Sequence, residues 1–398
     1  MACKFFFNYF KLVIKMKNSE VKIRVVRNKT DRQLFCEINS ICMMGDKFWV
    51  PPLKEMVLNQ INPNKNSWFQ NGEAQFFIAE INNKPVGRLS VQLDYNHLNL
   101  HQDSIGFFGF FDSIDNQEVV NELFKKAFEW LKYKKIRKVR GPFSLNINQE
   151  SGLLIDGFES SQRMMMGHAK PYYEKLILNL GFSKVKDLYA YLTPMDTAIP
   201  YKYRHILERF ISRNSGLNFR HLDMKKYDRD IRIIVDLFNQ AWKDNWGFVP
   251  MTDADAKNMA KELKPIIIPE LVWFAFVDEK PAAMAVALPD LNEMISDLEG
   301  RLLPLNWIKL LWRIINRRTW SSRTRIPLMG VAPEFKNKTM GSILALIVIG
   351  SIREASLKLN LPICEMSWVL EDNRSTRHSL ESIGARIYKT YRVYEKEI

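Results

Sequence analysis

Apolar positions in the first half of the chain follow either the period of a strand or the period of a helix. Gln75–Ile81 and Pro85–Asp94 alternate with a period of two, and the turn residues 82–84 between them indicate a β-hairpin. Asn116–Lys135 repeats its apolar residues every three to four positions, which predicts a helix. The other predicted elements are, in chain order, a strand from Val21, a helix after Thr30, strands at Ser104–Phe111 and Lys138–Phe143, a helix at Tyr172–Leu180 and a strand at Lys184–Leu192.

The second half repeats this order of elements. Val272–Val277 and Ala282–Leu288 form a second predicted hairpin, and Ser342–Leu359 reads as a long apolar helix. The other elements are a strand at Asn218–Leu222, helices at Ile231–Trp242 and Ala254–Leu263, strands at Arg325–Val331 and Ile363–Val369, a helix at Ser375–Ser382 and a strand at Ile387–Tyr394. The repeat predicts an α+β fold of two tandem domains, at 20–195 and 212–398. Because no low-complexity linker separates them, we expect the domains to pack together.

The composition is that of a soluble globular protein. A length of 398 residues favours two domains, and 46% hydrophobic with 26% charged residues excludes a disordered chain, a collagen and a coiled coil. The four cysteines are too few and too scattered for a disulfide framework or a zinc cluster, so we expect a reducing compartment and no metal.

The net charge of +14 is concentrated in two short segments. Residues 1–19 hold four lysines and no acid, and residues 301–325 hold seven basic residues and no acid, so these segments carry eleven of the fourteen charges. A protein that coats nucleic acid usually spreads its basic residues over a fold. The pattern favours an anionic membrane surface or an acidic ligand over nucleic acid.

Neither basic segment is long enough to span a bilayer. Residues 1–19 fit either an interfacial anchor or a leader that precedes a true start at Met16. In the insert 290–325, one stripe of a predicted helix is apolar and carries Trp307 and Trp312. The opposite, polar stripe contains Asn306, Lys309, Arg313, Asn316 and Arg317. Such a helix can lie in a membrane interface, roof an acyl-chain tunnel, or simply pack on the core.

The stretch Val331–Leu344 lies between a predicted strand and the long helix. Backbone N–H groups of such a loop, together with the helix N-terminus, suit a pyrophosphate, and Lys336 and Lys338 add positive charge. Gly341 allows close backbone approach, and Ser342 is the expected helix cap. An ordinary turn with solvated lysines has the same pattern.

This stretch resembles the acyl-CoA loop of the GNAT acyltransferase superfamily, V-x-P-x-Y/F-R/Q-x-x-G-x-G/A-x-x-L. The chain departs from that pattern at Lys336 and at Thr339, which stands in place of a glycine. Asn373 and Gly384 match a second superfamily element, but Leu380 occupies the place of its usual tyrosine, which protonates the leaving thiolate. The matching residues of the loop are Val331, Pro333, Phe335, Gly341 and Leu344.

The resemblance implies two GNAT-like domains, each a mixed, mostly antiparallel twisted sheet flanked by helices. In the first domain the loop is degenerate, because Asp112, Asp115 and Glu118 would repel a pyrophosphate. Only the second domain is therefore expected to bind acyl-CoA. The cofactor-binding residues implied are Val331, Lys336, Lys338, Thr339, Met340, Gly341, Ser342 and Asn373.

A closer resemblance, to a tandem GNAT-like bacterial family that includes the ceramide synthases, covers nearly the whole chain. It implies transfer from acyl-CoA to a primary amine, such as a sphingoid base. Together with the basic, apolar segments, this leads us to expect direct transfer by a cytoplasmic protein at the inner membrane surface. Other members have no assigned reaction, so a small-amine acetyltransferase and a non-catalytic CoA- or lipid-binding protein stay open. The resemblance is carried by Arg140–Phe158, Gly167–Tyr173, Leu303–Trp312, Ser367–Asn373 and Lys389–Glu395.

Direct transfer needs a base for the amine and a donor for the leaving thiolate. Glu150 and His168, in stretches without a clear period, are the candidate bases; Glu371 and Asp372 are further catalytic candidates or simply caps of the next helix. Cys364 lies in an apolar strand and is read as packing. Tyr172, Tyr173, Tyr388 and Tyr391 are the unranked substitutes for the missing tyrosine. The expected substrate-binding residues are Asn146, Asn148, Tyr172, Tyr173, Trp307, Trp312, Trp368 and Tyr391.

Overall fold

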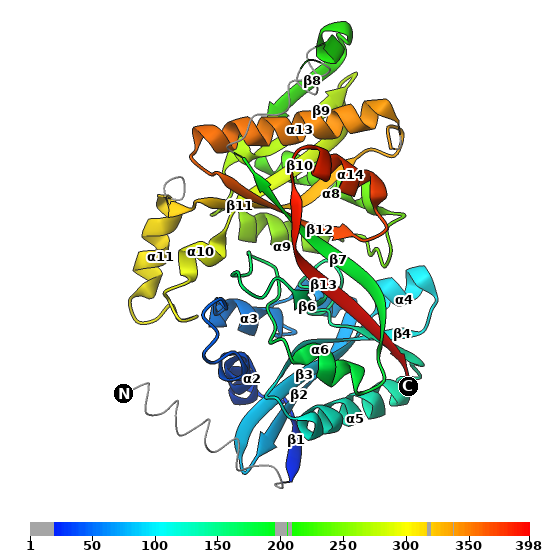
Figure 1. The fold of residues 1–398 in the computed structure, drawn as a ribbon, viewed down its shortest axis with the longest axis vertical. Coiled ribbons are helices and arrows are strands. Elements are labelled where there is room, and N and C mark those ends of the chain that lie inside the picture. Colours follow the sequence, from blue (N-terminus) through cyan, green and yellow to red (C-terminus); the bar gives the residue numbers. More distant parts are fainter. Residues whose placement is uncertain (1–19, 196–204, 206–208, 317–319, 337) are drawn as a thin grey trace.

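The computed structural model describes residues 20–195, 205, 209–316, 320–336 and 338–398. The predicted leader 1–19 and the basic residues Arg317 and Arg318 lie outside this part of the chain. The remaining residues form two lobes, one above the other in Figure 1, which share one sheet.

The first lobe follows the predicted order of strand, helices, hairpin, strand, helix, strand, helix and strand. The turn between the hairpin strands has positive φ at Asn82 (51°) and Asn83 (58°), the conformation that a two-residue hairpin turn requires. Short elements that the periodicity did not predict are α3, η1, α4 and β6. The elements are β1 (Val21–Val25), α2 (Lys29–Cys42), α3 (Lys54–Gln60), η1 (Ser67–Gln70), β2 (Gly72–Ile81), β3 (Lys84–Asp94), α4 (Tyr95–His101), β4 (Ile105–Ser113), α5 (Gln117–Tyr133), β5 (Lys138–Gly141), β6 (Leu153–Asp156), α6 (Tyr173–Leu178) and β7 (Ser183–Pro194).

The second lobe repeats this order and adds a helical insert between β10 and β11. Its long helix begins three residues earlier than predicted, at Thr339. The elements are β8 (Leu217–His221), η2 (Met224–Lys226), α8 (Tyr227–Trp242), α9 (Asp253–Leu263), η3 (Pro269–Leu271), β9 (Val272–Val277), β10 (Lys280–Pro289), α10 (Leu291–Ile295), α11 (Asn306–Ile315), β11 (Arg323–Val331), α13 (Thr339–Lys358), β12 (Ile363–Leu370), α14 (Arg374–Ser382) and β13 (Arg386–Glu397).

The last strands of the two halves are exchanged. The sheet order is β1-β2-β3-β4-β5-β13-β7-β12-β11-β10-β9-β8, with β6 pairing on β13 off this path. β13, from the end of the chain, therefore pairs with β5 of the first lobe, while β7 pairs with β12 of the second. The two exchanged strands also pair with each other, and Figure 1 shows them crossing the molecule between the lobes.

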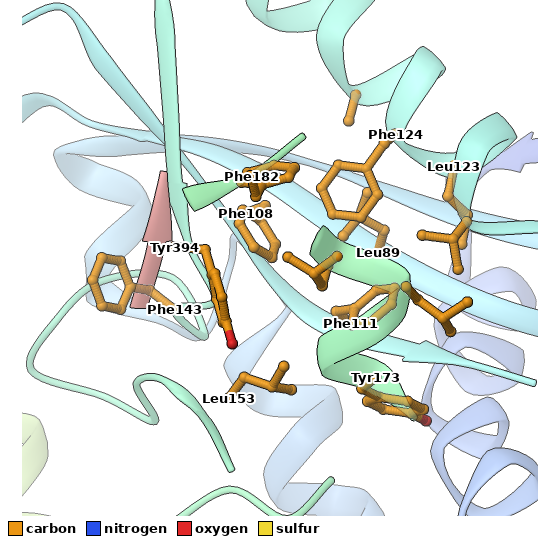
Figure 2. Packing of buried hydrophobic residues seen from close by; sticks show 14 of the residues in the cluster. Leu89, Phe108, Phe111, Leu123, Phe124, Phe143, Leu153, Tyr173, Phe182 and Tyr394 are labelled. Atoms are coloured by element: carbon orange, nitrogen blue, oxygen red, sulfur yellow. The ribbon is translucent and has the colours of Figure 1, made fainter. Parts of the chain in front are cut away.

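The exchanged strand contributes to the core of the first lobe. Phe108, Phe124 and Phe182 stack edge to face with ring centroids 5.1–5.4 Å apart, and Tyr394 of β13 is completely buried in the same cluster (Figure 2). Aromatic rings packed this way add about 0.5–1.5 kcal/mol per pair beyond their burial. The first-lobe core thus depends on residues from the far end of the chain.

The parallel strands β11 and β12 of the second lobe diverge. Between the corresponding strands of the first lobe, β4 and β5, the space is filled by backbone. β11 and β12 are paired only from Arg323/Ile363 to Ile326/Met366 in the described residues. In the first lobe the Phe143 carbonyl lies so close to Gly109 that a Cβ there would be 1.8 Å from it. The two lobes therefore differ at the place where the parallel strands of each half separate.

One charge attributed to the degenerate first-lobe loop lies elsewhere. Asp112 is a buried residue of β4, and its carboxylate accepts a hydrogen bond from Arg88 Nε at 2.7 Å. It therefore faces the interior and not a loop that would repel a phosphate, which corrects that part of the sequence interpretation.

Separating the halves should unfold both of them, because each would lose the strand that it receives from the other. We expect 20–195 and 212–398 to be insoluble when expressed alone and to co-purify as a folded complex when expressed together. Solubility, co-purification and circular dichroism measure this. Two soluble halves with independent cooperative unfolding would contradict it.

Candidate functional site

The loop between β11 and α13 presents backbone donors at a helix start. The N-cap residue is Lys338, whose side chain makes no capping hydrogen bond, so within the described residues the first-turn N–H groups have no side-chain acceptor. Ser342 lies inside the first turn, where its N–H donates to Lys338 O at 3.3 Å, so the prediction that it caps the helix was wrong. The open helix start suits an anionic ligand.

Gly341 lies against the loop backbone. A Cβ at this position would be 2.2 Å from Phe335 O, so any side chain would push the loop away from the helix. Val331 ends β11 beside this contact, and Thr339 and Met340 open the helix. Lys338 is exposed, whereas Lys336 Nζ lies 3.4 Å from Ala241 O and 3.7 Å from the Asp244 carboxylate.

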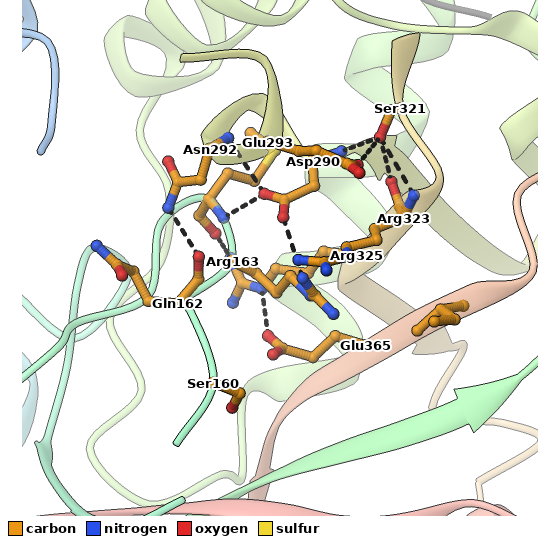
Figure 3. A network of polar contacts seen from close by, with 12 residues as sticks. Ser160, Gln162, Arg163, Asp290, Asn292, Glu293, Ser321, Arg323, Arg325 and Glu365 are labelled. Carbon is orange, nitrogen blue, oxygen red and sulfur yellow. Dashed lines mark hydrogen bonds and ion pairs between the residues drawn. The ribbon is translucent and has the colours of Figure 1, made fainter. Parts of the chain in front are cut away.

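A network of buried charges joins the two lobes where β11 and β12 diverge (Figure 3). Asp290 accepts hydrogen bonds from Met164 N at 3.0 Å and Asn292 N at 3.2 Å, and it lies 3.4 Å from Arg163 Nη1. Burial raises the pKa of Asp290 to about 6. This carboxylate therefore ties the start of the α10–α11 insert to the irregular stretch between β6 and α6.

The second part of the network is the pair Arg325 and Glu365. Arg325 donates to the hydroxyl and the carbonyl of Ser367 at 2.9 and 3.1 Å, and to Met164 O at 2.9 Å. Glu365, completely buried, accepts from Ser367 Oγ at 2.6 Å and from the Tyr388 hydroxyl. The sequence analysis did not single out the four charged residues of this network, which are Arg163, Asp290, Arg325 and Glu365. Their signal was a charge inside an apolar strand, as in Arg325 of β11 and Glu365 of β12.

Part of the Glu150 side chain is accessible to solvent, although much protein surrounds its carboxyl group. Its side chain is exposed, yet desolvation by the surrounding protein raises its pKa to about 7, with Asp112 adding to the rise and Arg88 opposing it. Its carboxyl has no hydrogen-bond or ion-pair partner among the described residues, and a Cβ on Gly167 would lie 2.8 Å from its Oε1. This carboxyl, unpaired within the described residues and with a raised pKa, has the properties of a general base.

His168 follows Gly167 directly, so the structure brings the two candidate bases close together. Its ring is buried, with Nε2 3.2 Å from the Asp46 carboxylate and Nδ1 without a partner in the described residues. Burial lowers the pKa of His168, and the Asp46 charge opposes this. A neutral imidazole whose Nε2–H donates to Asp46 leaves Nδ1 as an acceptor, which is also the form of a general base.

Glu371 and Asp372 are engaged elsewhere, at the end of β12. Glu371 lies 2.7 Å from Lys184 Nζ and Asp372 lies 2.8 Å from Lys186 Nζ, so both form ion pairs with β7. The Asn373 side chain caps α14 by accepting from Thr376 N at 3.2 Å. These contacts give all three a structural role in the described chain.

The predicted substrate-binding residues of the first lobe have hydrogen-bond partners within the protein. Asn146 Nδ2 donates to the Asp94 carboxylate at 3.2 Å, and Asn148 Nδ2 donates to Val249 O at 2.9 Å in the second lobe. Tyr172 donates to Ser113 O at 2.9 Å, and the Tyr173 hydroxyl lies 3.3 Å from the Asp112 carboxylate. In contrast, Trp368 Nε1 and the Tyr391 hydroxyl are buried without a partner in the described residues.

The α11 helix has its apolar stripe on the outside. Trp307, Trp312 and Ile315 are 48%, 56% and 67% exposed, with Ile308 and Leu311 between them at 49% each. The predicted polar stripe is partly turned inward: Arg313 is 3% exposed and forms a two-point ion pair with Asp297 at 2.6 and 2.9 Å. Arg325 is buried as well, so two of the five basic residues that the structure describes in segment 301–325 do not reach the surface.

Three other expectations concern the cysteines, metals and membrane spans. Cys364 is completely buried and burial raises its pKa to about 12, as expected for packing. No group of three or more potential metal ligands occurs among the described residues. Of the described helices, α13 alone has the length and hydropathy to cross a membrane, but 61% of its most apolar window is buried and it packs on β9 and β10.

The fold is that of tandem GNAT proteins. A tandem GNAT protein from the clavulanic acid biosynthesis pathway matches 95% of this chain and 98% of its own, with a TM-score of 0.54 and 9% identity. A GCN5-related N-acetyltransferase from Sphaerobacter thermophilus matches 95% of both chains, with a TM-score of 0.51 and 12% identity. These matches confirm the predicted tandem α+β fold.

The sequence itself identifies the family. The chain is 36% identical over 384 residues to the bacterial ceramide synthase of Caulobacter vibrioides (strain NA1000 / CB15N), covering 96% of this chain and 98% of that protein. It is also 36% identical over 383 residues to the protein YghO of Escherichia coli (strain K12), covering 94% and 95%. No protein-family model matches the chain. The chain therefore belongs to the family of these two proteins and is a GNAT-family acyltransferase by relationship.

Replacing Gly341 with valine should weaken CoA binding, because the new side chain would force the loop carbonyl of Phe335 away from the helix start. We expect a loss of at least roughly tenfold, about 1.4 kcal/mol, by isothermal titration calorimetry. The control is Glu354→Ala, an exposed residue near the other end of α13, which should bind CoA normally. Unchanged affinity in a folded Gly341→Val variant would contradict the assignment.

Proposed function

We propose that this protein is an acyl-CoA-dependent N-acyltransferase that moves a long acyl chain onto the primary amine of a long-chain lipid such as a sphingoid base. The observation that carries the proposal is the apolar face of α11, which points to solvent on an insert tied to the lobe junction by Asp290. The relationship to a bacterial ceramide synthase supports the same substrate class.

The donor would be held in the second lobe. The first turn of α13 and Lys338 offer N–H groups and positive charge to the pyrophosphate. The reacting end of the donor would reach the region where β11 and β12 diverge, next to the buried network of Arg325 and Glu365. The corresponding region of the first lobe is filled by Phe143, so we assign one donor site to the molecule.

Glu150 would be the base. A protonated amine first loses one proton to solvent through the Glu150 carboxylate. The amine nitrogen then attacks the thioester carbon, Glu150 takes its second proton, and the C–S bond breaks. That proton ends on the departing sulfur, so the products are an amide and CoA thiol. A pKa near 7 lets the carboxyl accept and return protons at neutral pH.

The acceptor would come from an anionic membrane at the cytoplasmic face. Burying a Leu, Ile or Phe-sized side chain stabilises a complex by about 1.5–3 kcal/mol, so five side chains already half buried contribute roughly 1 kcal/mol each. A basic residue near an anionic surface adds about 1 kcal/mol. Lys309 is exposed but paired with Asp297, so apolar contact outweighs charge in this proposal.

Incubation with acyl-CoAs of several chain lengths and a panel of amines, with free CoA and product mass measured, tests the reaction. We expect transfer with long-chain donors and long-chain amines. Transfer only to small polar amines would favour an acetyltransferase, and CoA binding without thiol release would favour a non-catalytic binding protein. Either result overturns the proposal.

Glu150→Gln should lower kcat by about 10²–10⁴-fold, because the amide cannot accept a proton. Since only the ionised carboxyl is a base, kcat/KM of the wild type should rise with pH to a plateau above about 7, and the variant should lose this rise. CoA affinity should stay unchanged. If His168→Gln is crippling while Glu150→Gln is silent, His168 is the base.

Replacing Trp307, Leu311 and Trp312 with serine should release the protein from anionic vesicles and should change stability little, since these side chains are about half exposed. Co-sedimentation at low and high salt measures binding; residual binding at high salt indicates the apolar contribution. The matched control is Tyr133→Ser, an exposed aromatic residue of α5. Undiminished sedimentation of the triple variant would contradict a membrane role for α11.

A further inference from the structure

The hydroxyl of Tyr391 is a buried hydrogen-bond donor without a partner. The residue is 0% exposed, and the structure gives its oxygen no hydrogen bond within the described chain. Leaving a buried polar group unsatisfied costs about 1–3 kcal/mol, so such a group needs an explanation. Phenylalanine at position 391 would fill the same space without this cost, so packing alone does not explain a tyrosine here.

Three other tyrosines of the predicted site already use their hydroxyl groups. Tyr172 donates to Ser113 O, Tyr173 lies at hydrogen-bond distance from Asp112, and Tyr388 donates to Glu365. Among these candidates, Tyr391 alone keeps its proton available. The structure therefore ranks residues that the sequence left equal.

Tyr391 is one of a set of register partners on adjacent strands that leads across the sheet from β13 to β12, toward the place where β12 diverges from β11. It is the register partner of Leu188 on β7, and Leu188 is the register partner of Leu370 on β12. Trp368, two residues before Leu370, packs against the same hydrophobic cluster as Tyr391. Its Nε1 is a second buried donor without a partner.

Glu150 approaches Tyr391 from the other side. Gly152, two residues after Glu150, has positive φ (82°), and a Cβ there would lie 2.9 Å from Tyr391 Cβ. The charges of Glu365, Arg325 and Glu150 all act on the Tyr391 hydroxyl. The hydroxyl is thus within electrostatic reach of both the proposed base and the network at the strand divergence.

Two buried donors, one O–H and one N–H, call for an acceptor rather than a cation. We propose that the Tyr391 hydroxyl and Trp368 Nε1 form the hydrogen-bonding site for the carbonyl oxygen of the acyl thioester, which becomes negatively charged during transfer. This inference rests on the proposed acyl transfer and adds to it the residues that stabilise the developing oxyanion.

The electron and proton balance of the step is unchanged by this assignment. When the amine nitrogen attacks, the carbonyl π electrons move to the oxygen, and they return when the C–S bond breaks. Burial raises the pKa of Tyr391 well above its usual value, so the hydroxyl stays protonated and only donates a hydrogen bond. The proton for the sulfur comes from the amine through Glu150.

Tyr391→Phe should lower kcat by about 10²–10³-fold, the usual effect of removing one oxyanion donor. CoA affinity should not change, and thermal stability should be equal or higher, because an unpaired hydroxyl is removed. Trp368→Phe should give a kcat loss of the same kind. The control on the same strand is Tyr394→Phe, whose hydroxyl donates to Glu174 at 2.6 Å; it should lower stability and leave kcat unchanged.

A dithioester analogue of the acyl-CoA, with sulfur in place of the carbonyl oxygen, separates a catalytic from a structural role. Sulfur accepts hydrogen bonds weakly, so the wild type should slow markedly with this donor, whereas Tyr391→Phe should slow much less. Additive effects of variant and analogue overturn the inference, and so does a Tyr391→Phe enzyme with normal kcat. In both cases wild-type transfer from acyl-CoA leaves the proposed function standing. A wild type that transfers to none of the amines overturns both.

Discussion

The exchange of β7 and β13 is the constraint on which the rest of the molecule depends. Strand pairing is continuous from β1 to β8 only because β13 pairs with β5 of the first half, β7 pairs with β12 of the second half, and β7 and β13 pair with each other. Buried backbone N–H and C=O groups must be hydrogen-bonded. If either lobe lost the strand that it receives from the other half, its sheet would end in an unpaired edge. The exchange fixes the orientation of the lobes and brings residues far apart in sequence, such as Glu150 and Tyr391, to one place.

Buried charge is concentrated where the lobes meet. Arg163 from the first half faces Asp290 from the second, and Arg325 faces Glu365 across the strands about to diverge. Removing one partner of a buried ion pair typically costs 3–5 kcal/mol, whereas the complete pair contributes little net stability. The network is therefore better explained by specificity: it links β11 and β12 among the last residues that pair before they diverge, and it anchors the stretch that carries Gly167 and His168 beside Glu150. Lys389 of β13 reinforces this by donating to the carbonyls of Gly157 and Ser160.

The surface of the insert and this interior network are physically connected. Asp290 caps α10 and also binds the backbone of Met164. Arg313 holds α11 against the same segment, with the apolar side of α11 outward, by donating to Met294 O of α10 and to Asp297 just after it. A helix that turns an arginine inward and two tryptophans outward is arranged for an apolar partner. A displacement of α11 would therefore also displace α10, whose cap Asp290 is hydrogen-bonded to Met164 beside the proposed reaction site.

The sequence by itself determined the two repeated sets of elements, the loop before the long helix of the second half and the loop position of Glu150, because local periodicity and turn chemistry are properties of neighbouring residues. It did not determine the strand exchange, since β7 and β13 have the same local pattern whichever sheet they join. It placed Arg313 on the polar stripe of α11, but only the fold shows that this arginine turns inward to pair with the Asp297 carboxylate. It could not rank the tyrosines either, because a hydroxyl is free or engaged only through contacts such as Tyr388 with Glu365, which lie 23 residues apart and exist only in the folded chain.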